Sequence, residues 1–130
     1  MAVTHSATAA AAATNAVVDL LDVGTGRATG ALVYQTSGGV EVATCLLSNP
    51  AFGAGTAAAP SVATAATITA DTSATGGTIA KAQLEDRDSA AHILCSVTAT
   101  GGGGDIEITS VVVAALETVD TTSLTYTGPA

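Results

Sequence analysis

Two runs of alternating side chains, joined by a short polar turn, fill residues 75–105. The residues that share one face are Ala80, Ala82 and Leu84 in the first run and Ile93, Cys95 and Val97 in the second. Because side chains alternate with a period of two along a strand, each run predicts a strand. Residues 86–89 supply a tight turn between the runs, and four glycines at residues 101–104 close the segment. The pattern predicts an antiparallel hairpin against which the rest of the chain packs.

The N-terminal residues 6–22 are predicted to form a helix. Ser6 can cap its first turn, the alanine run favours helix, and Gly24 supplies a left-handed stop. The residues at helical spacing, expected to form the packed face, are Ala13, Val17, Leu20 and Leu21. Asp19 and Asp22 lie at the end of the helix that disfavours acidic groups. Arg27 is a candidate partner for them, and a solvated polar face is the alternative.

From residue 31 onward the pattern has a period of two, with glycines at a hairpin turn near residues 38–39. An irregular loop is expected over residues 48–60, and the consecutive valines at residues 111–113 predict a strand covered on both faces, by the helix or by another subunit. The chain therefore predicts a mainly β fold: an antiparallel β-sandwich or jelly-roll-like domain of seven or eight short strands with one N-terminal α-helix. We expect one domain over residues 1–130, with the helix at 6–22 and the β-sandwich at 31–127.

The core is predicted to be poor in aromatic residues, which favours association. Hydrophobic residues make up 48% of the chain, but aromatic residues only 2%. A buried aromatic ring contributes roughly 150–250 Å² each, so a core of smaller side chains leaves the monomer marginal. Association would stabilise it, and a closed ring would also protect strand edges in a chain with a single lysine. The candidate subunit contacts are Phe52, Leu94, Val111 and Val113, with a core position as the alternative for Phe52.

The charge of the chain excludes several classes of partner. A formal net charge of −8 repels phosphate backbones and anionic lipids, so we expect neither direct nucleic-acid binding nor membrane binding. The N-terminal segment fits neither a secretory signal nor a membrane span, which predicts synthesis in a cytoplasm. Cys45 and Cys95 are interpreted as reduced thiols. A disulfide between them stays an alternative if their strands lie side by side.

The residue types needed for catalysis or metal binding lack the required spacing. The glycine run is not followed by the Lys-Ser/Thr pair of a phosphate-binding loop, and the His and Cys residues show no zinc-site spacing. Glu85, Asp86 and Asp88 form an acidic patch, interpreted as a solvated turn rather than a calcium loop. His92 has no G-x-S-x-G serine to activate. The sequence predicts a protein that is not an enzyme and has no cofactor and no metal.

Several motifs resemble a known family. They are LLSNPAFG at residues 46–53, VATA at 62–65 with Ile68, and the L-x-D-x-D-S turn at 84–89 within residues 78–96. In this order and spacing they resemble small virion structural proteins of tailed bacteriophages, over most of the chain up to Pro129. The chain has Gln83 and Ala90 where members are expected to have an aromatic residue and a glycine.

The resemblance implies a capsid cement or decoration protein. Such a protein would bind the major capsid protein on the outside of the head shell, as a homotrimer, and stabilise the shell mechanically after synthesis in the host cytoplasm. Phe52, Leu94, Val111 and Val113 would then also be candidate capsid contacts, and the acidic surface fits the shell exterior better than packaged DNA. The alternative is a tail or fibre-associated virion module that binds a host surface, for which Tyr34 and Tyr126 are the candidate exposed aromatics.

Overall fold

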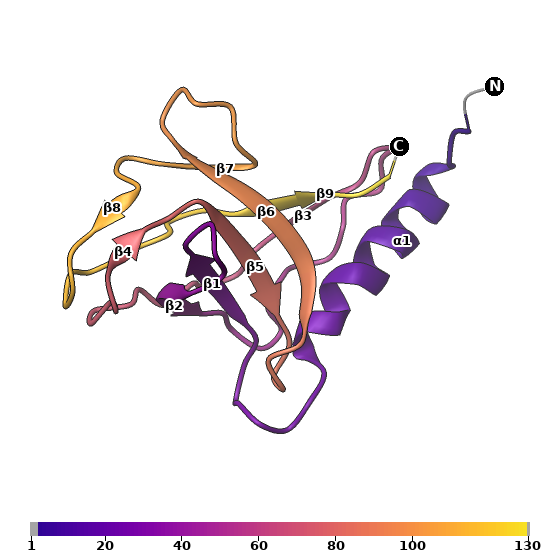
Figure 1. Cartoon of the computed structure of the whole chain (residues 1–130). Coiled ribbons are helices and arrows are strands. Elements are labelled where there is room, and N and C mark those ends of the chain that lie inside the picture. The colour runs from indigo at the N-terminus through magenta and orange to yellow at the C-terminus, as the bar shows by residue number, and fades with distance from the viewer. Residues whose placement is uncertain (1–2, 130) are drawn as a thin grey trace.

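The computed structural model describes residues 3–129, which form one N-terminal helix and nine short strands (Figure 1). The helix α1 spans Ala7–Asp19 and continues into a 3-10 turn, η1, over Leu20–Asp22. The strands are β1 (Ala31–Gln35), β2 (Glu41–Leu46), β3 (Val62–Thr64), β4 (Gly77–Thr78), β5 (Lys81–Glu85), β6 (Ala91–Ala99), β7 (Ile106–Ile108), β8 (Val112–Val113) and β9 (Thr125–Thr127). The predicted mainly β, sandwich-like fold with an N-terminal helix is confirmed, with nine strands in the described residues instead of seven or eight.

The helix begins and ends as predicted but buries a different face. The hydroxyl of Ser6 accepts a hydrogen bond from the amide of Ala9 at 3.2 Å. Gly24 follows with a φ of 118°, in the left-handed region. The buried helical residues are Ala10, Thr14, Val18 and Leu21 instead of the predicted Ala13, Val17, Leu20 and Leu21. Most of the face is therefore turned by one residue, or about 100°. Packing against β3 and β9 decides which face of this alanine-rich helix is buried.

Five strands form the main sheet, in the order β2-β1-β5-β6-β7. Its hairpins, β1–β2 and β5–β6, are the two that the sequence predicts, and antiparallel pairing of β1 with β5 joins them. The register places Leu84 opposite both Leu32 on β1 and Ile93 on β6. The apolar side chains of the two hairpins therefore lie on the same face of the main sheet. Two smaller sheets, β3-β9 and β4-β8, complete the fold.

The ladder between β6 and β7 is parallel, in contrast to the antiparallel pairing that was expected. Parallel neighbours usually need a connection of about a dozen residues or more, whereas residues 100–105 alone connect these strands. Gly101 and Gly103 adopt left-handed φ values of 88° and 80°. Their amides both donate to the carboxylate of Glu107, at 3.1 Å each. The glycine run is a strand connection, as predicted, and its left-handed residues allow the chain to reverse in so few residues.

Strand β3 is short and ends at Thr64. The residues that follow run along the outer edge of β2. The amide of Thr69 donates to the carbonyl of Leu46 at 2.8 Å. The amide of Thr75 donates to the carbonyl of Val42 at 2.9 Å. This edge of the main sheet is therefore covered by the chain itself.

The core lies between the main sheet and the segments that carry β3 and β9. Its largest fully buried side chains include Tyr34, Leu21, Leu32, Val18 and Val42. The hydroxyls of Tyr34 and Thr121 share a hydrogen bond of 2.6 Å, which gives the buried phenol a partner. Burial raises the pKa of Tyr34. The only phenylalanine, Phe52, also belongs to this core.

The two cysteines are free, and the fold keeps them apart. Cys45 lies on β2 and Cys95 on β6, with β1 and β5 between them. Three ladder spacings of about 4.8 Å separate strands in these positions, whereas a disulfide needs Cα atoms about 4.4–6.8 Å apart. The disulfide alternative is thus ruled out within one chain. Burial raises the pKa of both thiols.

Candidate functional site

The four predicted contact residues lie in different environments. Phe52 is 4% exposed, and its backbone forms a bridge with Ala65, so it occupies the core position, one of the two alternatives for it. Val113 on β8 is 8% exposed. Leu94 on β6 is 75% exposed, and Val111 is only partly buried. Leu94 and Val111 are therefore the two predicted contacts that a partner can reach without rearrangement of the core.

The described chain does not cover both faces of the valine run, contrary to the expectation for residues 111–113. Val112 is 65% exposed, whereas Val113 is buried. The helix, one of the two covers expected, packs against β3 and β9 on the other side of the domain from β8 (Figure 1). Cover by another subunit stays a prediction.

A turn next to β8 carries the most exposed large apolar side chain in the described residues. Leu116 is 76% exposed and has a φ of 70°. Its amide donates to the carbonyl of Ala74 at 2.8 Å, which holds the turn in place. A left-handed conformation costs a residue with a Cβ about 1–2 kcal/mol. Sequence patterns did not single out Leu116, because no local pattern marks a leucine as the left-handed residue of a turn.

Three shallow grooves in the described part of the chain adjoin β7. The first, of about 230 Å³, lies between β7 and β8. The second, of about 290 Å³, lies between β6, β7 and β9 and contains Leu94. The third, of about 320 Å³, separates residues 106–109 from residues 120–123. Ile106 lines the second and third grooves and Ile108 the first and third, so the grooves follow one another along β7.

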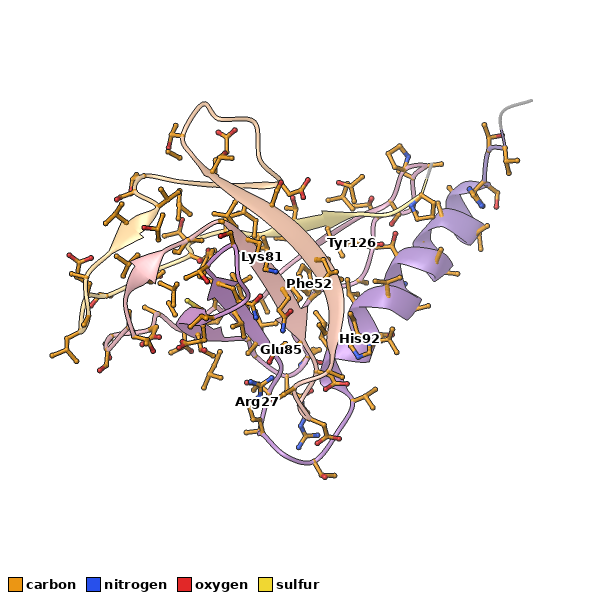
Figure 2. The ribbon with its side chains drawn as sticks, in the orientation of Figure 1. Arg27, Phe52, Lys81, Glu85, His92 and Tyr126 are labelled. Atoms are coloured by element: carbon orange, nitrogen blue, oxygen red, sulfur yellow. The ribbon has the colours of Figure 1, made fainter. Side chains whose placement is uncertain are left out.

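These grooves are lined by acidic residues and by no basic residue. Their carboxylates belong to Asp105, Glu107, Glu117 and Asp120. Of the three basic residues in the sequence, Arg27 lies near the turn of the β5–β6 hairpin, Arg87 lies in that turn, and Lys81 lies on β5. Figure 2 shows Arg27 and Glu85 together at this end of the hairpin. The surface around β7 therefore has a negative potential.

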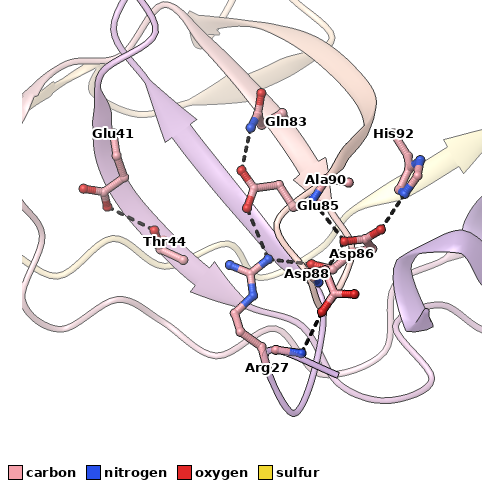
Figure 3. Close-up of polar contacts among 10 residues, drawn as sticks. Arg27, Glu41, Thr44, Gln83, Glu85, Asp86, Asp88, Ala90 and His92 are labelled. Atoms are coloured by element: carbon pink, nitrogen blue, oxygen red, sulfur yellow. Dashed lines mark hydrogen bonds and ion pairs between the residues drawn. The ribbon is translucent and has the colours of Figure 1, made fainter. Parts of the chain in front are cut away.

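The acidic turn is solvated, as predicted, only at Asp88, whereas Glu85 and Asp86 are each 7% exposed and bond to other groups of the chain (Figure 3). Arg27 forms an ion pair with Glu85 at 3.1 Å and donates to the carbonyl of Asp86 at 2.6 Å. Arg27 was considered as a partner of Asp19 or Asp22, but the structure pairs it with Glu85. Asp22 instead accepts a hydrogen bond from a loop amide, that of residue 51, at 2.9 Å.

Asp86 and Asp88, the two aspartates of this turn, each accept hydrogen bonds from backbone amides. Asp86 accepts hydrogen bonds from the amides of Asp88 and Ala90, and its other oxygen lies 2.9 Å from Nε2 of His92. The bond to His92, followed by that to the Ala90 amide, lowers the pKa of Asp86. The amides of Thr25 and Gly26 bond to Asp88 at 2.9 and 2.7 Å and lower its pKa. Asp88 therefore joins the loop after the helix to the hairpin turn, whereas Asp86 holds the hairpin turn itself.

The described residues contain no candidate metal site. Among residues 3–129, no group of three or more His, Cys, Asp or Glu side chains is placed to hold an ion. The β7–β8 side combines grooves, carboxylates and exposed apolar side chains, and it is the candidate contact region.

Comparisons with family models, with curated proteins and with solved structures found no match for this chain. In the described residues, no helix combines the length and the apolar character that crossing a bilayer requires.

Proposed function

We propose that the chain is a structural virion protein of a tailed bacteriophage, a cement or decoration protein without enzymatic activity. It binds the major capsid protein on the outside of the head shell, as a homotrimer, and strengthens the shell mechanically. The observation that carries the proposal is the incompletely covered apolar surface beside β7 and β8. On this side Val112 on β8 and Leu116 in the turn after it are 65% and 76% exposed, and Leu94, at a separate groove between β6 and β9, is 75% exposed.

The energetics of this surface favour association. Full burial of a valine or leucine side chain is worth about 1.5–3 kcal/mol, so a few such residues in each subunit contribute a large share of a small domain's stability. The core gives the single subunit little excess stability, because Phe52 is its only phenylalanine and Tyr34 its only fully buried tyrosine. A subunit that covers Val112 and Leu116 would supply the second cover expected for the valine run.

The charge of the chain supports a position on the outer face of the shell. A net charge of −8 would disfavour close contact with packaged DNA. The alternative, a tail or fibre module that binds a host surface, is less favoured. Of its two candidate aromatics, Tyr34 is fully buried and Tyr126 is half-buried.

Light scattering across a dilution series, followed by cosedimentation with phage heads that lack the protein, tests the proposal. We expect a mass of about three times 12.4 kDa and saturable binding to the heads. A protein that stays monomeric and does not cosediment with heads would refute the proposal. Binding to intact host cells without binding to heads would favour the host-surface alternative.

A further inference from the structure

The two edges of the main sheet differ in how the chain covers them. The outer edge of β2 accepts hydrogen bonds from the amides of Thr69 and Thr75, as described above. At the other edge, β7 pairs with β6 alone. Beyond β7 lies the groove of about 320 Å³ that separates it from residues 120–123. The main sheet thus has one covered edge and one open edge.

The backbone of β7 presents hydrogen-bonding groups to this groove. The carbonyl of Ile108 accepts a hydrogen bond from the amide of Thr100, on the β6 side, at 2.9 Å. Backbone groups of successive residues in a strand point to alternate sides. The amide and carbonyl of Glu107 therefore point away from β6, towards the groove, as does the amide of Thr109, which lies opposite the Ile108 carbonyl in one trans peptide plane. An extended segment in the groove can pair with these groups, as in recognition by β-strand addition.

Charge decides which kind of segment fits. The grooves along β7 are lined by Asp105, Glu107, Glu117 and Asp120. An extended segment with alternating residues would place every second side chain over apolar groups such as Ile106 and Ile108. The intervening side chains would lie near the carboxylates. Lysine and arginine at these positions gain from the negative potential, whereas acidic residues are repelled.

We propose that the open edge of β7 binds an extended, basic segment of a partner protein as an added strand. The proposal rests on the function proposed above, in which the partner is the shell protein. A second copy of this chain is a poorer occupant of this edge, because the chain carries eleven acidic and only three basic residues. Subunit association would then use the apolar turn at Leu116, which leaves the β7 edge to the other partner.

A synthetic peptide tests the proposal with the intact protein. The probe is a fluorescently labelled nine-residue peptide of alternating valine and lysine, followed by fluorescence anisotropy at low and high salt. One control peptide has glutamate in place of lysine. A second control peptide carries N-methyl groups on the amides along one edge of its extended backbone. These groups remove the hydrogen-bond donors needed for strand pairing and keep the charge of the peptide. We expect salt-sensitive binding of the parent peptide and no detectable binding of either control.

Variants of the protein locate the binding site. Asp120→Asn removes a carboxylate that lines two of the grooves, and Asp19→Asn makes the same charge change on the helix. We expect Asp120→Asn to weaken binding about two- to fivefold, as for an exposed ion pair, and Asp19→Asn to leave it unchanged. Thr109→Pro removes a backbone donor that points into the groove and is expected to abolish binding. Circular dichroism shows whether this variant is folded.

Several results would overturn the proposal. These are no binding of the parent peptide, equal binding of the N-methylated peptide, and equal effects of Asp120→Asn and Asp19→Asn. The last result would mean that the peptide responds only to net charge. These outcomes are separate from the test of the proposed function. Heads that bind Thr109→Pro as tightly as the unaltered protein would refute strand addition and leave the cement function intact.

Discussion

Replacement of Leu116 by glycine separates the stability of the fold from the stability of the assembly. The backbone at this residue has a φ of 70°, which glycine adopts without the clash of a Cβ. Relief of this strain is worth about 1–2 kcal/mol, from which the extra entropy of an unfolded glycine removes about 0.5–1 kcal/mol. We therefore expect the Leu116→Gly subunit to be as stable as the unaltered subunit, or more stable by about 1 kcal/mol.

The same substitution should weaken association. The side chain of Leu116 is 76% exposed in the single chain, so its burial by a neighbour is worth about three-quarters of the usual 1.5–3 kcal/mol. Three such contacts in a trimer amount to about 3–7 kcal/mol. Because the midpoint concentration of trimer dissociation varies as the square root of the dissociation constant, we expect it to rise roughly tenfold to three-hundredfold.

Sedimentation equilibrium across a dilution series measures the midpoint, and urea unfolding at a concentration below it measures the stability of the subunit. Val23→Thr is the matched control, because Val23 is 56% exposed but lies in the loop bound to the hairpin turn, away from β8. If Leu116→Gly leaves the midpoint unchanged, or if Val23→Thr shifts it as much, the turn is not a subunit contact. A subunit that is clearly less stable would refute the strain argument.

Two further predictions concern the fold itself. Asp86 and Asp88 have a lowered pKa in the folded state, so their contribution to stability is complete above the ordinary aspartate pKa of about 3.9 and is lost as the pH falls through the folded values. Thermal melts from pH 7 to pH 2 should show a fall in Tm below about pH 4 that is shallower in Asp88→Asn, and an equal slope in both proteins would contradict it. Phe52→Ala should destabilise the subunit by about 3–5 kcal/mol, because it leaves a cavity around a side chain that is 4% exposed. Urea unfolding measures this loss, and a loss below about 1 kcal/mol would mean that Phe52 is not a core residue.

Local patterns in the sequence predict the elements whose causes are local. The β1–β2 and β5–β6 hairpins follow from a period of two on each side of a polar turn, and the helix follows from Ser6 and the alanine run. The buried face of the helix is not predictable in this way, because alanine provides little contrast between faces. Partners distant in the sequence are also missed. Arg27 binds Glu85, 58 positions away, although two aspartates lie nearer in the chain.

The candidate site lies where local and tertiary preferences disagree. A leucine occupies a left-handed turn position, a valine within a run of three faces solvent, and a glycine-rich connection forces a parallel edge strand that has a groove beside it. The acidic turn at the other end of the domain is held by hydrogen bonds and an ion pair to the loop after the helix. Natural sequences usually agree with their folds at every level, and departures concentrate at functional sites. Three such departures around β7 and β8 therefore support the proposal that partners contact this side, which the alternation of residues alone cannot reveal.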